Sequence, residues 1–373
     1  MSKLDSPAIL CFLLILSSSG CRLVETQPSS TSTSNIAALT ISNPSLPSVS
    51  EVTPTPPPEQ AIVPIPINGP LATPEAEVSG MAWYGEYLIL LPQFPSRFAQ
   101  PGSDGSIYAL PKAEIIAFLD GSQTAPLNPI AIPFVAPGLA DLIYGFEGFE
   151  AITISGERAY FTIESHSGAP MVALLTTARI SPDLSLVKLD TSTLVVLSPQ
   201  TLLPNYSDEA MFVSGEEAIT IYEANGKSIN ANPVAHRLDL ATFSLETIPF
   251  PNLEYRITDA TDIDSAGRFW VINTFSPKDS WMAADTDPIV EKFDEEVSGE
   301  ATSHFKSGTV ERLVELQYTP AGITLTDTPP VQLKLIEGES LRNWEALARL
   351  DERGFLLMTD KHPRSILAFV PIP

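Results

Sequence analysis

The chain has 373 residues and a formal net charge of −24 at pH 7. This length allows one large domain or two medium-sized domains. The excess of acids argues against nucleic acid and anionic lipid surfaces as partners, because both carry negative charge that repels the chain. It suits a site that binds a cation, although a solvated acidic surface would also account for most of the charge.

The first 21 residues are typical of an export signal. Residues 8–16 are apolar and follow Lys3, and the run is too short to span a membrane as a stable helix. The sequence Ser-Ser-Gly-Cys that ends at Cys21 resembles a bacterial lipobox, whose cysteine is lipidated and becomes the N-terminus. We therefore expect an extracytoplasmic protein of the cell envelope that is anchored to the membrane by lipid on Cys21. The alternative is a secreted protein with an ordinary cleaved signal peptide.

Residues 22–59 are rich in serine, threonine and proline. Such a segment cannot bury enough apolar surface to fold, and its prolines favour an extended backbone. We expect a disordered tether that leads to a folded domain over residues 60–373. Cleavage before Cys21 would leave the mature chain with one cysteine, so the core must stabilise this domain without an intrachain disulfide.

A fifteen-residue pattern recurs through the predicted domain. The segments 79–93, 150–164, 209–223 and 259–273 each read as two short strands around a turn, with a polar residue at both ends. A fifth copy begins at Glu345 and reaches its second acid one residue late, at Asp360. Self-similarity of this kind indicates a repeat architecture. We interpret each copy as the inner hairpin of a blade in an all-β propeller.

Each hairpin is followed by sequence that could supply further strands. These strands are 106–118 and 130–134, then 171–180 and 184–197, then 234–240 and 243–250, then 309–318 and 323–335, and finally 365–370. The last unit lacks one strand, which the proline-containing segment 61–67 could provide as an edge strand that closes the ring. We predict five four-stranded blades, with six as the alternative because a degenerate blade could lie between 259 and 345. Residues 277–307 lack strand alternation and look helical near 288–296, so we expect a surface insertion there.

Antiparallel pairing should bring the two ends of each hairpin side by side, near the central channel. The first positions are Ser79, Glu150, Glu209, Asp259 and Glu345, and the last positions are Gln93, Glu164, Glu223, Asn273 and Asp360. Carboxylates crowded around a channel either stay protonated or share a cation. Hard oxygen ligands favour calcium, so the seven acids of this set are candidate metal ligands. Alternatively, each acid accepts hydrogen bonds from the backbone of the neighbouring blade and locks the ring.

Basic residues that follow the second strands should reach the same face. Arg97, Lys361 and Arg364 are candidates to bind an anionic group of a substrate. His166 and His362 are the candidate general acid or base. An equally open interpretation makes all five exposed loop residues without a role. The sequence contains no nucleophile elbow, zinc-protease helix, phosphate-binding loop or dinucleotide fingerprint.

The sequences FEAITISGERAYFTIES and NWEALARLDERGFLLMTDKH resemble the acid-led repeats of the phytase-like propeller family, also called esterase-like activity of phytase. Similar hairpins occur in the five-bladed calcium-activated nucleotidases. The resemblance covers about residues 79–373 and implies calcium in the channel and hydrolysis of phosphoester or ester bonds. It makes Glu150, Glu209 and Glu345 channel acids. The second position of the repeat is mostly alanine here, where those families favour glycine.

Two functional hypotheses follow from these observations. In the first, an exported monomer hydrolyses a small anionic or ester substrate at a calcium ion, and His166 or His362 moves the proton. In the second, the calcium is structural, and the propeller binds a ligand or a cell-surface protein without catalysis. The missing nucleophile motif favours the second hypothesis, and the basic residues beside the acids favour the first.

Overall fold

The computed structural model of the protein describes residues 59–372, apart from 167, 169, 294–302 and 336–340. The predicted signal peptide, Cys21 and all but the last residue of the predicted tether therefore lie outside the described residues. The fold belongs to the unit that residues 53–373 form. Among the described residues, no helix has the length and apolar character needed to cross a membrane.

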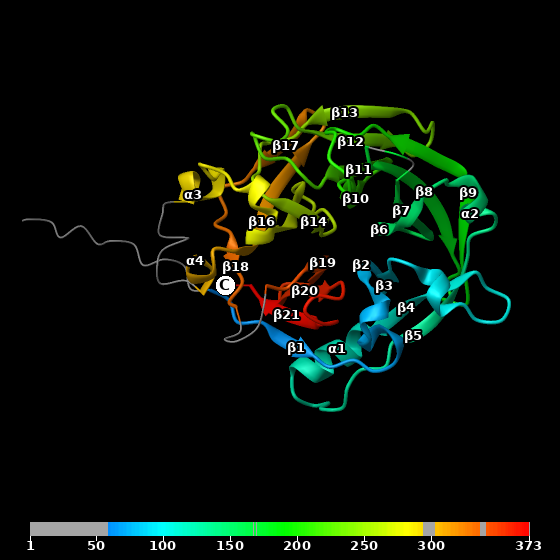
Figure 1. Cartoon of the computed structure of the whole chain (residues 1–373). Helices are drawn as coiled ribbons and strands as arrows, with labels where there is room; N and C mark the ends of the chain where they lie inside the picture. The colour runs from blue at the N-terminus through cyan, green and yellow to red at the C-terminus, as the bar shows by residue number, and fades with distance from the viewer. Residues whose placement is uncertain (1–58, 167, 169, 294–302, 336–340, 373) are drawn as a thin grey trace, which may run out of the picture. The chain divides into compact units, whose positions relative to one another are not determined.

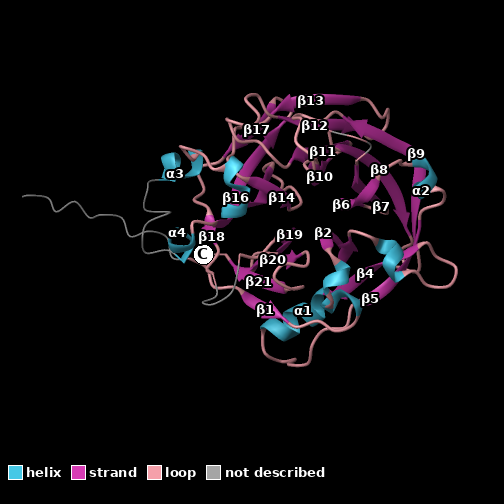
Figure 2. Ribbon diagram, in the orientation of Figure 1, coloured by secondary structure: helices cyan, strands magenta, loops and turns pink. Residues whose placement is uncertain are grey.

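Strands dominate the described residues, so the all-β prediction is confirmed (Figure 2). The first hairpin, β2 (Val78–Tyr84) and β3 (Tyr87–Pro92), continues into β4 (Gly105–Pro111) and β5 (Ile130–Val135). The second, β6 (Phe146–Ser155) and β7 (Arg158–Ser165), continues into β8 (Val172–Ile180) and β9 (Val187–Leu197). Parallel pairing of β5 with β9 joins these two units into one eight-stranded sheet.

The remaining units form separate sheets. One contains β10 (Asp208–Ser214), β11 (Glu217–Tyr222), β12 (Val234–Asp239) and β13 (Leu245–Pro249). The next contains β14 (Arg256–Ala260), β15 (Arg268–Phe275), β16 (Val310–Thr319) and β17 (Gly322–Leu325), and β18 (Val331–Gln332) pairs with β16. The last contains β19 (Trp344–Leu350), β20 (Gly354–Thr359), β21 (Leu367–Pro371) and β1 (Val63–Ile65).

The first strand of each predicted hairpin lies innermost in its unit (Figure 1). β2 contacts β6, β6 contacts β10, β10 contacts β14, β14 contacts β19, and β19 contacts β2. These contacts close a circle of five strands around a common centre, which gives the unit a propeller-like arrangement. The predicted hairpins are therefore present, and their first strands lie next to one another around this centre although they are far apart in the sequence.

The predicted pairing of the first strand with the last is confirmed. β1 runs antiparallel to β21, with Val63 opposite Phe369 and Ile65 opposite Leu367. The N-terminal strand thus covers residues 367–369 at the outer edge of the sheet that ends the chain.

Helices interrupt the strands at a few places, and one of them corrects the sequence analysis. The predicted strand 106–118 is wrong in its second half, because the strand ends at Pro111 and α1 (Lys112–Leu119) follows. The segment Lys-Ala-Glu-Ile-Ile-Ala-Phe-Leu consists mostly of good helix formers, and Ile115 buries one side of the helix. The short helix α2 (Leu139–Leu142) lies between β5 and β6.

The predicted surface insertion contains three short helices in its described part. It contains the 3-10 helix η4 (Pro277–Met282), then α3 (Pro288–Phe293) and α4 (Ser303–Ser307). The helical expectation near 288–296 is confirmed for 288–293, and the residues after it lie outside the described part. Three further 3-10 turns are η1 (Pro70–Ala72), η2 (Pro74–Ala76) and η3 (Pro95–Phe98).

Apolar side chains fill the spaces between neighbouring units. Where the first two units meet, the rings of Phe134, Phe149 and Phe161 pack edge to face, with centroids 5.5 to 5.9 Å apart. All three are buried, and aromatic pairs in this geometry add stabilisation beyond the area they bury. This packing fixes β6 and β7 against β5 and so sets the position of the acids at the ends of the second hairpin.

The closing strand offers a direct test of its contribution to stability. Ile65 is 2% exposed and Val63 is 43% exposed, although both belong to β1. We expect Ile65→Ala to lower the free energy of unfolding by about 2 to 5 kcal/mol, because it leaves a cavity in the core. The matched control Val63→Ala should change it by less than about 0.5 kcal/mol. Urea unfolding measures both, and equal effects would show that β1 does not bury a stabilising face.

Candidate functional site

A polar cavity of about 360 Å³ lies beside the first residues of the inner strands. Its lining contains eight carboxyl groups, from Glu77, Glu150, Glu164, Glu209, Glu223, Asp279, Glu345 and Asp360. The other lining residues are Ser79, Gln93, Asn205, Tyr206, Arg256, Asn343 and Lys361. Six of the seven candidate metal ligands are therefore brought together from three hairpins.

A β-bulge occurs at the first position of every inner hairpin. The pairing register shifts between Val78 and Gly80, Phe149 and Ala151, Asp208 and Ala210, Ile257 and Ala260, and Trp344 and Ala346. The residues skipped by these shifts include Ser79, Glu150, Glu209, Asp259 and Glu345. A bulge re-aims a side chain and interrupts the in-and-out alternation of a strand. The repeat of small polar or acidic residues thus marks a repeated bulge.

The fourth hairpin departs from this arrangement. Asp259 does not line the cavity, because its carboxylate accepts backbone hydrogen bonds from Leu347 at 2.6 Å and Ala260 at 2.8 Å. These bonds tie β14 to β19, as the alternative interpretation of the acids predicts. Asn273 is also buried, and its amide donates to the carbonyl oxygens of Glu254 and Arg256, at 2.8 and 3.2 Å.

Arg256, at the start of β14, places a guanidinium group among the acids. Its Nη2 lies 3.2 Å from Glu345 Oε1 and 3.7 Å from Glu209 Oε2, and its Nε donates to Glu223. Nη1 donates to Asn343 Oδ1 at 3.1 Å. One cation therefore connects carboxylates of two other sheets to its own, and only 20% of its side chain is exposed.

Arg256 is not among the predicted site residues, because it precedes the repeat. A signal was present, since an arginine stands three positions before Asp259 and another, Arg342, stands three positions before Glu345. The two arginines differ in their partners. Arg342 is buried against Glu311, with Nη2 at 2.6 Å from Oε2, and does not line the cavity.

Of the predicted basic residues, only one lines the cavity. Lys361 lines it, and its ammonium lies 2.7 Å from Glu77. Arg97 contacts the same carboxylate at 2.8 Å from outside the lining, and Arg364 is not a lining residue. His166 and His362 are exposed, and neither lines the cavity. The backbone N–H of His362 donates to Asp360 at 2.7 Å.

Gly148 leaves the space in which the side chain of Gln93 approaches Glu150. Gly148 has φ of +135°, and a Cβ atom there would lie 2.4 Å from Cγ of Gln93. Gln93 therefore needs this glycine in order to approach and donate from Nε2 to Glu150 at 2.9 Å.

The cavity carries more acid than base, since two cations, Arg256 and Lys361, face eight carboxyl groups. Burial raises the pKa of Glu150 well above its usual value, and repulsion from Glu164 raises it further. Burial raises the pKa of Glu164 to about 7 and that of Glu345 to about 8. Burial, followed by repulsion from Glu223 and Glu345, also raises the pKa of Glu209 well above its usual value. Several of these carboxyl groups therefore hold protons at neutral pH.

Arg256 keeps its charge in this surrounding. Burial alone would lower its pKa, but the carboxylates of Glu223, Glu345 and Glu209 raise the pKa well above its usual value. For Glu223, burial raises the pKa, while the charge and hydrogen bond of Arg256 act in the opposite direction. Arg256 thus favours the charged form of Glu223, but burial still leaves the pKa of this carboxyl group raised above its usual value.

Among the carboxyl groups that line the cavity, three oxygens have no hydrogen-bond partner in the described part of the chain. They are Oε1 of Glu164, Oε2 of Glu209 and Oε2 of Glu223, and all three are buried. Buried polar atoms of this kind are normally satisfied by a proton, a water molecule, a ligand or a cation. Oxygen donors suit calcium. Within the described ranges, however, no three or more His, Cys, Asp or Glu side chains are arranged to hold a metal ion.

No protein-family model matches the chain, and no curated protein matches it either. Solved structures resemble it with low identity. One is a thermostable family-43 glycoside hydrolase, with 10% identity over 83% of this chain and 91% of the other and a TM-score of 0.44. A second is a GH32 β-fructofuranosidase of Bombyx mori in complex with sucrose, with 8% identity over 84% of this chain and 60% of the other and a TM-score of 0.41.

A third is the hydrazine synthase of Kuenenia stuttgartiensis, with 9% identity over 79% of this chain and 87% of the other and a TM-score of 0.36. At these identities and TM-scores the likenesses carry no argument about the function of this chain.

The raised carboxyl pKa values predict how stability depends on pH. A carboxyl group whose pKa is higher in the folded than in the unfolded state stabilises the fold at low pH and loses this contribution as the pH rises through the folded pKa. With folded pKa values of about 7 for Glu164 and about 8 for Glu345, the loss should occur between pH 5 and 8. Each such group should lower the free energy of unfolding by about 1.4 kcal/mol per pH unit in this window.

Urea unfolding at pH 5, 6.5 and 8 checks this expectation. Glu150→Gln should weaken the pH dependence and raise the stability at pH 8, because it removes one repulsive carboxyl group and can still accept the hydrogen bond from Gln93. The control Glu86→Gln, at an exposed turn, should leave the pH dependence unchanged. Stability that is constant or rises from pH 5 to 8 would contradict the assignment of raised pKa values.

Proposed function

We propose that the protein is a hydrolase whose reaction centre is this acidic cavity, and that it cleaves an ester or glycosidic bond in a polar substrate. The observation that carries the proposal is the set of buried carboxyl groups around Arg256, in which burial raises the pKa of Glu164 to about 7, while the charge of Arg256 favours the ionised form of its partner Glu223. Carboxyl groups whose surroundings push their pKa values apart can act as acid and base in the same reaction.

In this proposal, Glu164 is the proton donor. Its pKa of about 7 is close to a neutral working pH, where a general acid or base is most effective, and its buried Oε1 has no partner among the described residues. Glu223 is the complementary carboxylate, because its ion pair with Arg256 favours the charged form. His166 and His362 lie outside the cavity, so proton transfer in the cavity is assigned to carboxyl groups.

The charge of the cavity argues for a neutral substrate. A phosphoester would carry negative charge into a lining with six more carboxyl groups than cations, so it could bind only with a cation such as calcium. A neutral ester or glycoside needs no such ion. Substrate hydroxyl groups could also donate hydrogen bonds to the unpartnered oxygens of Glu164, Glu209 and Glu223.

The proposal also includes the number of blades and the location of the protein. We count the repeat as five blades, supported by the closed circle of five inner strands, and this count leaves no strand for a sixth blade among the described residues. We retain the lipid anchor at Cys21 and the cell envelope as the location, which rest on the sequence alone.

A second candidate function is a non-catalytic propeller that binds calcium. It is favoured by the excess of carboxyl groups and by the three buried carboxyl oxygens of the lining that have no hydrogen-bond partner among the described residues. Glu150, Glu164 and Asp360 make no ion pair with Arg256 among the described contacts, so these three would be the first carboxyl groups to hold the metal. The face of such a propeller would serve to bind a ligand or a cell-surface protein.

Hydrolysis of chromogenic p-nitrophenyl esters, glycosides and phosphates tests the first candidate. We expect turnover of a neutral ester or glycoside, and Glu164→Gln should lower kcat/KM by about 10²- to 10⁴-fold because the proton donor is lost. The exposed control Glu86→Gln should keep full activity. Turnover that is equal in wild type and Glu164→Gln would refute the role of the cavity as a reaction centre.

Thermal unfolding in EDTA and in excess calcium separates the two candidates. The calcium-binding propeller predicts stabilisation of about 2.7 kcal/mol at a hundredfold excess over the dissociation constant, together with no hydrolysis of any probe. The acid–base hydrolase predicts turnover that survives EDTA.

A further inference from the structure

Three basic side chains stand directly opposite one another on the second unit. Arg158 on β7 pairs with Arg179 on β8, and Arg179 pairs with Lys188 on β9. Residues that pair directly across strands project from the same face of a sheet, and like charges in such positions are destabilising. The row is unexpected in a chain with 21 basic and 45 acidic residues.

Nearby carboxylates do little to offset this repulsion. Arg179 makes one ion pair, with Glu157 at 4.0 Å, and both side chains are more than half exposed. Within the described residues, no carboxylate lies within ion-pair distance of Arg158 or Lys188. An exposed pair at this distance contributes little, so it offsets little of the repulsion between the three cations.

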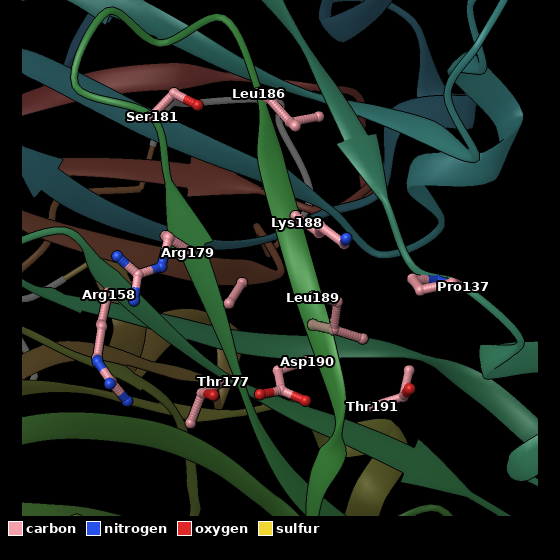
Figure 3. Close-up of a pocket in the computed structure, with 11 residues that line it drawn as sticks. Pro137, Arg158, Thr177, Arg179, Ser181, Leu186, Lys188, Leu189, Asp190 and Thr191 are labelled. Carbon is pink, nitrogen blue, oxygen red and sulfur yellow. The ribbon is translucent and has the colours of Figure 1, made fainter.

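The same three side chains line a groove of about 580 Å³. Figure 3 shows the guanidinium groups of Arg158 and Arg179 on one side of β8, and the ammonium group of Lys188 on the opposite side of β9, toward Pro137. The hydroxyl groups of Thr177 and Ser181 add polar atoms to the lining. The groove shares no lining residue with the acidic cavity.

One acid, Asp190, lies in the groove. Its Oδ1 accepts from the hydroxyl and the N–H of Ser192, at 2.6 and 3.1 Å. The hydrogen bonds from Ser192 lower the pKa of Asp190, and the charges of Arg158 and Lys188 lower it further. The carboxylate is therefore ionised, and one negative charge faces three positive charges.

We propose that this groove binds a small solute that carries a phosphate group. The guanidinium groups of Arg158 and Arg179 lie on the same side of β8 (Figure 3) and supply two positive charges, which match a phosphate dianion. Guanidinium groups bind phosphate oxygens in a bidentate manner. The groove is larger than inorganic phosphate, so it can also hold a polar remainder such as a sugar. A lipid headgroup is disfavoured as the source of the phosphate, because the chain as a whole carries a charge of −24 and is repelled by anionic membranes.

The test is calorimetric titration of the full chain with inorganic phosphate and glucose 6-phosphate, in a buffer free of phosphate and at low salt. We expect saturable binding of both, and a loss of affinity of at least tenfold in the double variant Arg158→Gln/Arg179→Gln. The control Arg353→Gln, at an exposed ion pair with Asp120, should bind like wild type. Absence of binding, or equal binding by the double variant, would overturn the proposal.

Thermal unfolding gives a second measurement on the same variants. Without phosphate, the double variant should melt at a higher temperature than wild type, because the repulsion between paired cations is relieved. Phosphate should raise the melting temperature of wild type and not that of the double variant. Binding to vesicles of phosphatidylglycerol without binding to soluble phosphate would also overturn the proposal. Glu164→Gln should leave phosphate binding unchanged, so the result is independent of the proposed hydrolase activity.

Discussion

The contact of one guanidinium group with three carboxylates is the interaction on which the centre of the fold depends. Arg256 leaves β14 and meets Glu223, Glu209 and Glu345, which belong to the third and fifth hairpins. Charges removed from water are stable only when they are paired, and breaking such a pair leaves a buried charge without compensation. The inner ends of three hairpins are thus held by one cation.

The fourth hairpin differs from the others because it supplies a cation to the cavity. The second, third and fifth hairpins place acids in the cavity, whereas the fourth places Arg256 there, and its own acid, Asp259, accepts a backbone hydrogen bond from β19. Asn273 supports the arrangement by donating to the carbonyl oxygen of Arg256 and accepting from Arg312 at 2.8 Å. The repeat therefore provides five similar bulges around the centre. Arg256, which lies outside the repeat, supplies the positive charge that pairs with the carboxyl groups.

Much of the fold followed from the sequence, because strand alternation and the fifteen-residue period are local signals. The five hairpins, the closing strand at Val63–Ile65 and the gathering of six acids were predicted on that basis. The helix at Lys112–Leu119 was missed because its apolar residues also fit a strand. Arg256 was missed because a single arginine outside the repeat gains its meaning only from long-range contacts with Glu345 and Glu209. His166 and His362 were chosen for their position after a strand, and the direction of a loop is not set by its neighbours in sequence.

The free energy of unfolding of Arg256→Gln at pH 8 tests this account most directly. The account predicts a loss of about 3 to 5 kcal/mol, because Glu223 would lose its buried ion pair and hydrogen bond, and Glu209 and Glu345 would lose the cation that favours their charged forms. Arg268→Gln removes an arginine whose ion pair with Asp264 is half exposed, so it should cost less than about 1 kcal/mol. A loss for Arg256→Gln no larger than that of Arg268→Gln would contradict the central role of this guanidinium group.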